Sequence, residues 1–171
     1  MSMLRHLLAI ALLPVVATVV VPSLIVGDAD IGWGLPSGVA VLPVVLGTGV
    51  IAIGLLLMVR TVVLFARVGR GTLAPWDPTS HLVVLGPYRY VRNPMISGVL
   101  FILLGEAALL GSVPQLIWAA IFFAANAVYM PLVEEPGLAR RFGEEYETYR
   151  AHVPRWLPRL RPWQGTADVR G

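Results

Sequence analysis

Long apolar runs separated by short polar segments dominate the chain. Residues 7–26 and 35–59 contain no charged side chain, and each run is long enough to cross a hydrocarbon core about 30 Å thick as a helix. The first run exceeds the usual length of a signal-peptide core, and no small-residue cleavage site follows it, so we interpret it as a membrane span. The second run is longer than one straight crossing requires, so we expect this helix to tilt or to protrude from the bilayer.

Two further runs lie close together in the second half of the chain. Residues 95–110 form a short run that contains Glu106, and residues 113–133 form a full-length one. Only Gly111 and Ser112 separate them, which predicts a helical hairpin. The pattern as a whole predicts an all-α integral membrane protein with four transmembrane helices.

Composition supports this prediction and limits the chemistry. The chain of 171 residues is 57% hydrophobic and 13% charged, and its mean hydropathy is +0.75. It has no cysteine, which excludes disulfides, thiolate metal sites and a cysteine nucleophile. The three histidines, His6, His81 and His152, are too far apart in sequence to indicate a metal cluster, so we predict a metal-free chemistry.

The distribution of arginine predicts the orientation. All 13 basic residues are arginines, and in a four-span arrangement all of them fall on one side, which the positive-inside rule makes cytoplasmic. Both termini are then cytoplasmic. The net charge of +3 indicates attraction to anionic lipid headgroups and no nucleic-acid partner. The arginine-, alanine- and valine-rich usage fits a bacterium, and we expect the plasma membrane.

Two polar segments leave the membrane on this cytoplasmic side. Residues 69–94 carry glycine and proline turn signals. Within residues 134–160, the stretch from Phe142 to Tyr149 predicts a short amphipathic helix at the membrane interface, and a proline-rich segment ends it. Because both segments leave on the same side, we expect a single domain, 1–171, in which they fold together and cap a pocket.

The candidate site residues lie at the membrane ends of these two segments. Glu134 and Glu135 follow directly on the fourth span, where an unpaired carboxylate is costly. They either pair with nearby arginines such as Arg140 or Arg141, or they face a positively charged ligand. Arg92 either obeys the positive-inside rule or clamps a carboxylate.

Asn93 and Pro94 mark the start of the third helix. Pro94 suits the first helical position, where its missing N–H costs nothing, and Asn93 is a candidate N-cap. Carboxylates, an arginine and tyrosines beside a helix start would suit a zwitterionic ligand with an extra positive charge. S-adenosylmethionine fits this description, although amino acids and lipid headgroups share most of its features.

Several ordered motifs between residues 81 and 158 resemble a known group of membrane enzymes. The motifs are His81-Leu-Val-Val84, Gly86-Pro-Tyr88, Tyr90-Val-Arg92-Asn-Pro94, Gly98, Glu134-Glu135, Leu138, Phe142-Gly143-x-x-Tyr146-x-x-Tyr149 and Val153-Pro-Arg155. Their order is similar to that of the isoprenylcysteine carboxyl methyltransferase and phospholipid methyltransferase superfamily. The resemblance implies methyl transfer from S-adenosylmethionine.

The resemblance also implies roles for individual residues. His81, Leu82, Val83 and Val84 would lie along the adenosine, and Tyr88, Arg92, Asn93 and Pro94 would contact the methionine portion. Glu134, with Glu135 beside it, would face the ammonium group. Glu134 and Arg92 are the candidate catalytic residues. A general base, if the acceptor needs one, would be Glu134, Glu135 or a tyrosine.

Three positions depart from the superfamily's pattern. Asn93 and Ile96 stand where its members often carry histidine and tyrosine. The Asn-Pro-Met sequence found here is nearer to the phospholipid methyltransferase branch. Met130 stands where prenylcysteine methyltransferases carry an arginine for the substrate carboxylate, which argues against a prenylcysteine substrate. The Gly-x-Gly of the phospholipid branch is not reproduced at Gly86-Pro87-Tyr88, and Gly47-Thr48-Gly49 is interpreted as a helix-packing feature.

We therefore predict methylation of a lipophilic or amphiphilic acceptor that enters from the bilayer between the second and fourth spans. One alternative is a membrane reductase of the steroid 5-alpha-reductase type that uses NADPH, although no dinucleotide fingerprint is visible. Another is a non-catalytic lipid-binding membrane protein. The acceptor and the oligomeric state are open at this stage.

Overall fold

The computed structural model describes residues 14–26, 32–68 and 82–165, and every regular element within them is helical. The elements are η1 (Val16–Val20), α2 (Val21–Val26), α3 (Ser37–Val68), η2 (Gly86–Arg89), α4 (Pro94–Leu110), α5 (Val113–Tyr129), η3 (Met130–Glu134), α6 (Glu135–Phe142) and α7 (Glu144–His152). The predicted all-α class is confirmed for these residues. The start of the first predicted span, residues 7–13, lies outside them.

Two segments are long and apolar enough to cross a membrane. They are Gly38–Leu64 and Val113–Phe142, and only 11% and 17% of their most apolar windows are buried inside the protein. Large apolar side chains such as Leu42, Val45 and Ile121 are more than half exposed. Core helices of water-soluble proteins bury such residues, so these helices are candidate membrane spans. The helical stretches Val16–Val26 and Pro94–Leu110 are shorter.

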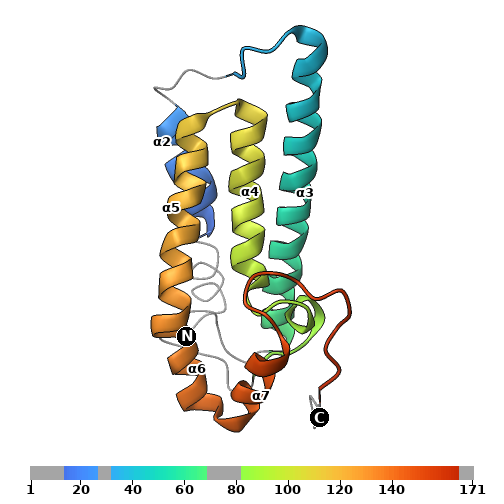
Figure 1. The fold of residues 1–171 in the computed structure, drawn as a ribbon, viewed down its shortest axis with the longest axis vertical. Helices are drawn as coiled ribbons and strands as arrows, with labels where there is room; N and C mark the ends of the chain where they lie inside the picture. The colour runs from blue at the N-terminus through green and yellow to red at the C-terminus, as the bar shows by residue number, and fades with distance from the viewer. Residues whose placement is uncertain (1–13, 27–31, 69–81, 166–171) are drawn as a thin grey trace.

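The predicted hairpin is confirmed. Helix α4 ends at Leu110, and Gly111 adopts the left-handed conformation (φ +62°) that favours glycine at a helix C-terminus. The Ser112 hydroxyl then accepts a hydrogen bond from the backbone N–H of Gln115 at 3.4 Å and caps α5. Local sequence signals thus determine this turn, which joins the upper ends of α4 and α5 in Figure 1.

Glycines bring α3 and α4 into close contact. A Cβ atom on Gly47 would lie 2.7 Å from the carbonyl oxygen of Gly105, and one on Gly54 would lie 2.6 Å from that of Gly98. Small residues allow this backbone approach between membrane helices. Gly47 therefore has the predicted packing role, whereas a Cβ on Gly49 would meet nothing within 4 Å.

Two helices extend beyond the predicted membrane spans. The second predicted span ended at residue 59, but α3 continues to Val68. Residues 60–68 contain no proline or glycine that would end the helix earlier. The fourth predicted span ended at 133, but the helix continues through η3 into α6. Pro131 lacks an N–H and would clash in a regular α-helix, and the wider π-turn of η3 accommodates it.

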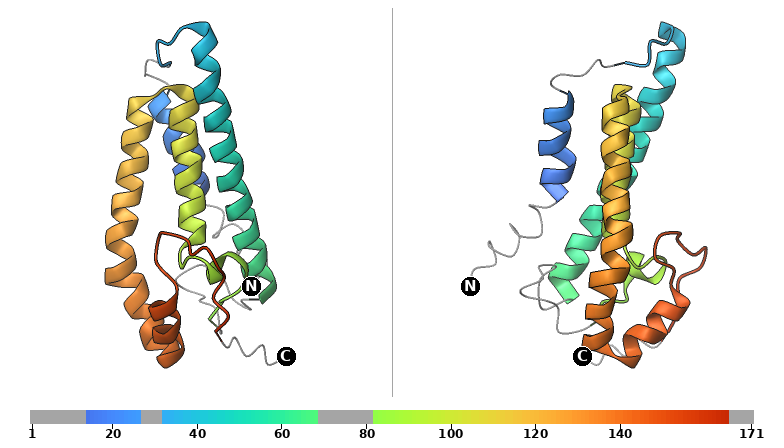
Figure 2. Two further views of the ribbon diagram at one scale, coloured as in Figure 1. Left: turned by 45° about the vertical axis from the view of Figure 1, so that its right-hand side comes forward. Right: turned by 60° about the vertical axis from the view of Figure 1, so that its left-hand side comes forward.

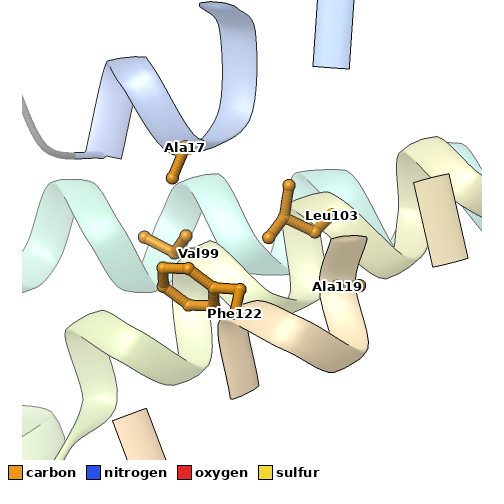
Figure 3. Close-up of a cluster of buried hydrophobic side chains, with 5 residues drawn as sticks. All are labelled: Ala17, Val99, Leu103, Ala119 and Phe122. Atoms are coloured by element: carbon orange, nitrogen blue, oxygen red, sulfur yellow. The ribbon is translucent and has the colours of Figure 1, made fainter. Parts of the chain in front are cut away.

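A small apolar core joins the first helix to the hairpin. Ala17, Val99, Leu103, Ala119 and Phe122 form it (Figure 3). The Trp118 indole N–H also donates to the carbonyl oxygen of Ala17 at 3.0 Å. Figure 2 shows the first helix on one side of the α4–α5 hairpin and the C-terminal segment on the other.

Candidate functional site

Residues 82–93, the loop before α4, pair with residues 144–163, which we call the tail. Three backbone hydrogen bonds of 2.9 Å join them: Arg92 N–H to Pro154 O, Arg159 N–H to Tyr90 O and Trp163 N–H to Arg89 O. The Arg89 Nε also donates to the carbonyl oxygen of Trp163 at 2.6 Å. Figure 1 shows the tail running back over the start of α4 at the end of the bundle that carries α6 and α7.

An apolar cluster lies beneath this pairing. Val84 from the loop packs with Tyr146, Tyr149 and Val153 from the tail, and all four are buried. The two tyrosines lie three positions apart on α7 and therefore share one helix face. The Tyr149 hydroxyl donates to the carbonyl oxygen of Tyr88 at 2.8 Å. The Tyr-x-x-Tyr spacing in the sequence is thus the signal for the face of α7 that docks on the loop.

Glu135 is the centre of a charged cluster that links three segments. Its carboxylate accepts hydrogen bonds from Arg155 Nε at 2.6 Å and Arg155 Nη2 at 2.9 Å, a bidentate pair. Arg92 Nη1 lies 3.0 Å from the same carboxylate, and the Glu135 side chain is only 7% exposed. Pairing of Glu135 with Arg140 or Arg141, one of the two interpretations above, is therefore wrong. Partners 20 and 43 positions away in sequence hold it instead.

Glu134 has a different environment. Its side chain is exposed, and within the described part of the chain its carboxylate makes no ion pair or hydrogen bond. It lies near Tyr88, whose phenol pKa is raised by burial first and by the charges of Tyr149 and Glu134 in addition. The two neighbouring glutamates are thus distinct: in the described structure Glu135 is buried and paired with two arginines, whereas Glu134 is exposed and paired with none.

Two buried donors beside this cluster have no hydrogen-bond partner in the described structure. They are Arg92 Nε and Asn93 Nδ2. The predicted N-cap role of the Asn93 side chain is wrong, because no side-chain hydrogen bond caps α4. It is the backbone carbonyl oxygen of Asn93 that bonds to α4: it accepts hydrogen bonds from the backbone N–H and the hydroxyl of Ser97, at 3.0 Å each. Pro94 begins α4 as predicted.

The tyrosines around the cluster are held in their neutral form. Burial raises the pKa of Tyr146 and of Tyr149. Arg92 Nη1 donates to the Tyr146 hydroxyl at 3.3 Å. These phenols therefore remain protonated at neutral pH and act as hydrogen-bonding groups, not as bases.

The remaining predicted site residues lie along the loop. His81 falls outside the described residues. Val83 and Val84 are buried, and Leu82 packs against the apolar cluster of the tail. Of the two departing apolar positions, Met130 is buried and Ile96 packs against the core of Figure 3. Both side chains therefore contribute to packing.

Sequence reasoning missed the role of Arg155. It appears in the quoted Val-Pro-Arg motif, but nothing in the local pattern indicates that its partner is Glu135. The hydrogen bond with Glu135 also raises the pKa of Arg155, as expected for a guanidinium paired with a carboxylate.

Comparison with known proteins adds a family assignment. The phospholipid methyltransferase family matches residues 41–145, which include α4, α5, η3, α6 and the Arg92, Glu134 and Glu135 positions. No curated protein and no solved structure matches the chain. Because the family match covers more than half of the 171 residues, the chain belongs to the phospholipid methyltransferase family of membrane methyltransferases.

Proposed function

We propose that the protein transfers a methyl group from S-adenosylmethionine to a lipophilic or amphiphilic acceptor at the cytoplasmic membrane interface. The observation that carries the proposal is a set of polar groups, in the loop before α4 and at the end of η3, that are not engaged by other parts of the described structure. Two buried donors, Arg92 Nε and Asn93 Nδ2, lack partners, and the Glu134 carboxylate is not engaged by an arginine. Donors for a carboxylate and an acceptor for a cation match the two charged ends of the amino-acid portion of the cofactor.

In this proposal Arg92 and Asn93 bind the cofactor carboxylate, and Glu134 faces its ammonium. Tyr88 and Pro94 border the same portion, and residues 81–84 border the adenosine. Glu135 acts indirectly: it fixes the Arg92 guanidinium through one terminal nitrogen at 3.0 Å and leaves the Nε donor for the ligand. The bound cofactor supplies an activated methyl group, so the protein's tasks are orientation and exclusion of water.

The environments of the acidic groups support one of the general bases considered above. Glu135 is paired with two arginines, and the buried tyrosines have raised pKa values. Glu134 therefore remains as the group that would accept a proton from an amine or hydroxyl acceptor. Arg92 would hold the reactants in line through its contact with the cofactor.

The proposed topology is four membrane crossings with both termini in the cytoplasm of a bacterium. The longer segments Gly38–Leu64 and Val113–Phe142 are candidate spans by length and composition, and α4 packs between α3 and α5 at the same level (Figures 1 and 2). The loop and tail then lie where a water-soluble donor and a membrane-soluble acceptor can meet.

Calorimetry with S-adenosylhomocysteine tests the proposal on detergent-purified protein. We expect saturable binding to the unmodified chain and at least about tenfold weaker binding to Glu134→Ala, because one charge-assisted contact is lost. Glu147→Ala is the matched control: among the described residues Glu147 forms an ion pair with Arg150 at the exposed surface of α7, 2.9 Å away, so its removal should leave binding unchanged.

Absence of binding to a folded, monodisperse sample would reject the cofactor. Binding of NADPH in its place would favour the reductase alternative, and S-adenosylhomocysteine binding without methylation of any lipid extract would favour the non-catalytic one. Equal affinities of Glu134→Ala and Glu147→Ala would reject the role of Glu134.

A further inference from the structure

Glu106 is the only charged side chain of α4, and it lies on the face of this helix that builds the apolar core. It follows Leu103, a member of the core in Figure 3, by three positions, so the two side chains share one helix face. On α5, Gln115 precedes Ala119 of the same core by four positions. The two polar residues therefore extend the core toward the turn of the hairpin, at the end opposite the loop and tail (Figure 1).

Glu106 and Gln115 pair with each other across the hairpin. Nε2 of Gln115 donates a hydrogen bond to Oε2 of Glu106 at 2.8 Å. Gln115 is completely buried, with 0% of the residue exposed, and its Oε1 atom has no hydrogen-bond partner in the described structure. Leaving a buried acceptor without a donor costs free energy. The pair thus lacks one hydrogen-bond donor.

No positive charge compensates a carboxylate at Glu106. It makes no ion pair among the described residues. The neighbouring elements η1, α2 and α5, and α3 as far as residue 59, contain no charged side chain. Asp28 and Asp30 fall outside the described residues. Because an ionised carboxylate inside a membrane segment is costly without a partner, Glu106 requires either a cation or a proton.

The surroundings favour a proton over a metal ion. Ca²⁺ and Mg²⁺ take about six or more oxygen ligands, and the described residues contain no group of three side chains that could hold a metal. A proton on Glu106 removes the charge and also turns the carboxyl group into a hydrogen-bond donor. One proton therefore meets both needs of the pair, the missing donor and the uncompensated charge.

We propose that Glu106 and Gln115 form a proton-binding site at the end of the hairpin opposite the loop and tail. Glu106 is a neutral carboxylic acid there: it accepts from Nε2 of Gln115 and donates to Oε1 of Gln115. The proton comes from water on that side of the membrane, and its release leaves the carboxylate. This inference rests on the proposed membrane crossing of α4 and is independent of methyl transfer.

Loss of the proton is expected to loosen this end of the molecule. Two hydrogen bonds from the residues before α3 cover the hairpin turn: Gly32 N–H to Leu110 O at 2.8 Å, and Trp33 Nε1 to Ala108 O at 2.7 Å. A charge on Glu106 would draw water into the core beside these bonds. The site thus couples the pH on this side of the membrane to the packing of α4 against α5.

Infrared spectroscopy of the full chain in nanodiscs detects the proton directly. At neutral pH, the difference spectrum between the unmodified chain and Glu106→Gln should contain the C=O stretch of a protonated carboxylic acid. Glu147→Gln is the matched control, because it makes the same change at the exposed surface of α7. Its difference spectrum should lack that band. A Glu106→Gln difference spectrum without the band would overturn the proposal.

Thermal unfolding at different pH values gives the second test. Unfolding transfers Glu106 to water, where a glutamate carboxyl has a pKa of about 4.3. The stability contributed by the bound proton is therefore complete below that pH and is lost as the pH rises. Between about pH 5 and about pH 9, the Tm of the unmodified chain should fall at least about 3 °C more than that of Glu106→Gln.

Two further variants complete the experiment. The double substitution Asp28→Asn and Asp30→Asn removes the other acidic residues between the first two helices and should keep the pH dependence of the unmodified chain. Parallel pH profiles of the unmodified chain and Glu106→Gln would reject the site. If Glu106→Gln does not fold, Gln115→Leu takes its place: the Glu106 carboxyl loses its partner, and its C=O band should move to higher frequency. An unmoved band would reject the pairing.

Discussion

The α3–α4 interface and the loop–tail interface each join segments that lie apart in sequence, but they do so with opposite chemistry. Helices α3 and α4 meet through Gly47, Gly54, Gly98 and Gly105, whose backbones are in direct contact. Loop and tail meet through backbone hydrogen bonds, buried tyrosines and the carboxylate of Glu135.

The difference follows from the surroundings of each interface. Between helices in lipid, apolar burial gives little net attraction, so close van der Waals packing has to hold them together. Outside the membrane, water competes for every polar group, and the buried Glu135 carboxylate offsets its desolvation by pairing with two arginines. The second kind of interface is also the one that can bind a charged ligand, and the unpartnered donors lie there.

The largest effect is expected when the glycine contact is broken. Gly54→Leu would place a Cβ atom 2.6 Å from the carbonyl oxygen of Gly98, which forces the two backbones apart. We expect a loss of about 3 kcal/mol or more in the free energy of unfolding, measured as a lower Tm and earlier aggregation in detergent.

Gly49→Leu is the control for this prediction, because nothing lies within 4 Å of a Cβ atom at that position. It should be close to neutral. Equal destabilisation by the two substitutions would contradict the role of the close contact, because leucine has the higher helix propensity and cannot destabilise the helix on that account.

A smaller but more selective effect is expected at the charged cluster. Glu135→Ala leaves Arg92 buried without its carboxylate, and removing one partner of a buried pair typically costs about 3 kcal/mol. Because the Arg155 side chain is 29% exposed, we expect less, about 2 kcal/mol, together with weaker binding of S-adenosylhomocysteine. Chemical denaturation and calorimetry on one preparation measure both.

Glu134→Ala sharpens this comparison, since its carboxylate is not engaged by an arginine. It should lower cofactor affinity while leaving the free energy of unfolding within about 0.5 kcal/mol of the unmodified chain. If both substitutions destabilise the fold equally, the division of labour between the two glutamates is wrong.

The smallest effect concerns a single hydrogen bond between loop and tail. Tyr149→Phe removes the donor to the carbonyl oxygen of Tyr88 at 2.8 Å, and a buried bond of this kind is worth about 1 kcal/mol. Hydrogen exchange of the loop amides should accelerate correspondingly, with little change in α3 and α4. Tyr129→Phe, at an exposed position on α5, should change neither quantity.

The extent of successful prediction differs between these regions. The hairpin turn and the start of α4 were predictable because Gly111 and Ser112 at the turn, and Pro94 at the start, act on their own neighbours in the chain. The helix through Pro131 was not, because its continuation depends on a π-turn that a run of apolar letters does not reveal. For the site, the motifs selected Arg92, Glu134 and Glu135, but the two glutamates were not separable by position alone.

The sequence by itself determined the helical class, the apolar segments, the α4–α5 turn and the family, because each depends on composition, local capping or ordered motifs. Only the tertiary structure decided that Glu135 binds Arg92 and Arg155 while Glu134 pairs with no arginine among the described residues, and that the Phe123 ring meets Trp156. The physical reason is that these pairings join residues between 20 and 43 positions apart. Which of two adjacent carboxylates meets a distant arginine depends on the rotation of the helix at η3 and the path of the tail, and no local pattern encodes either.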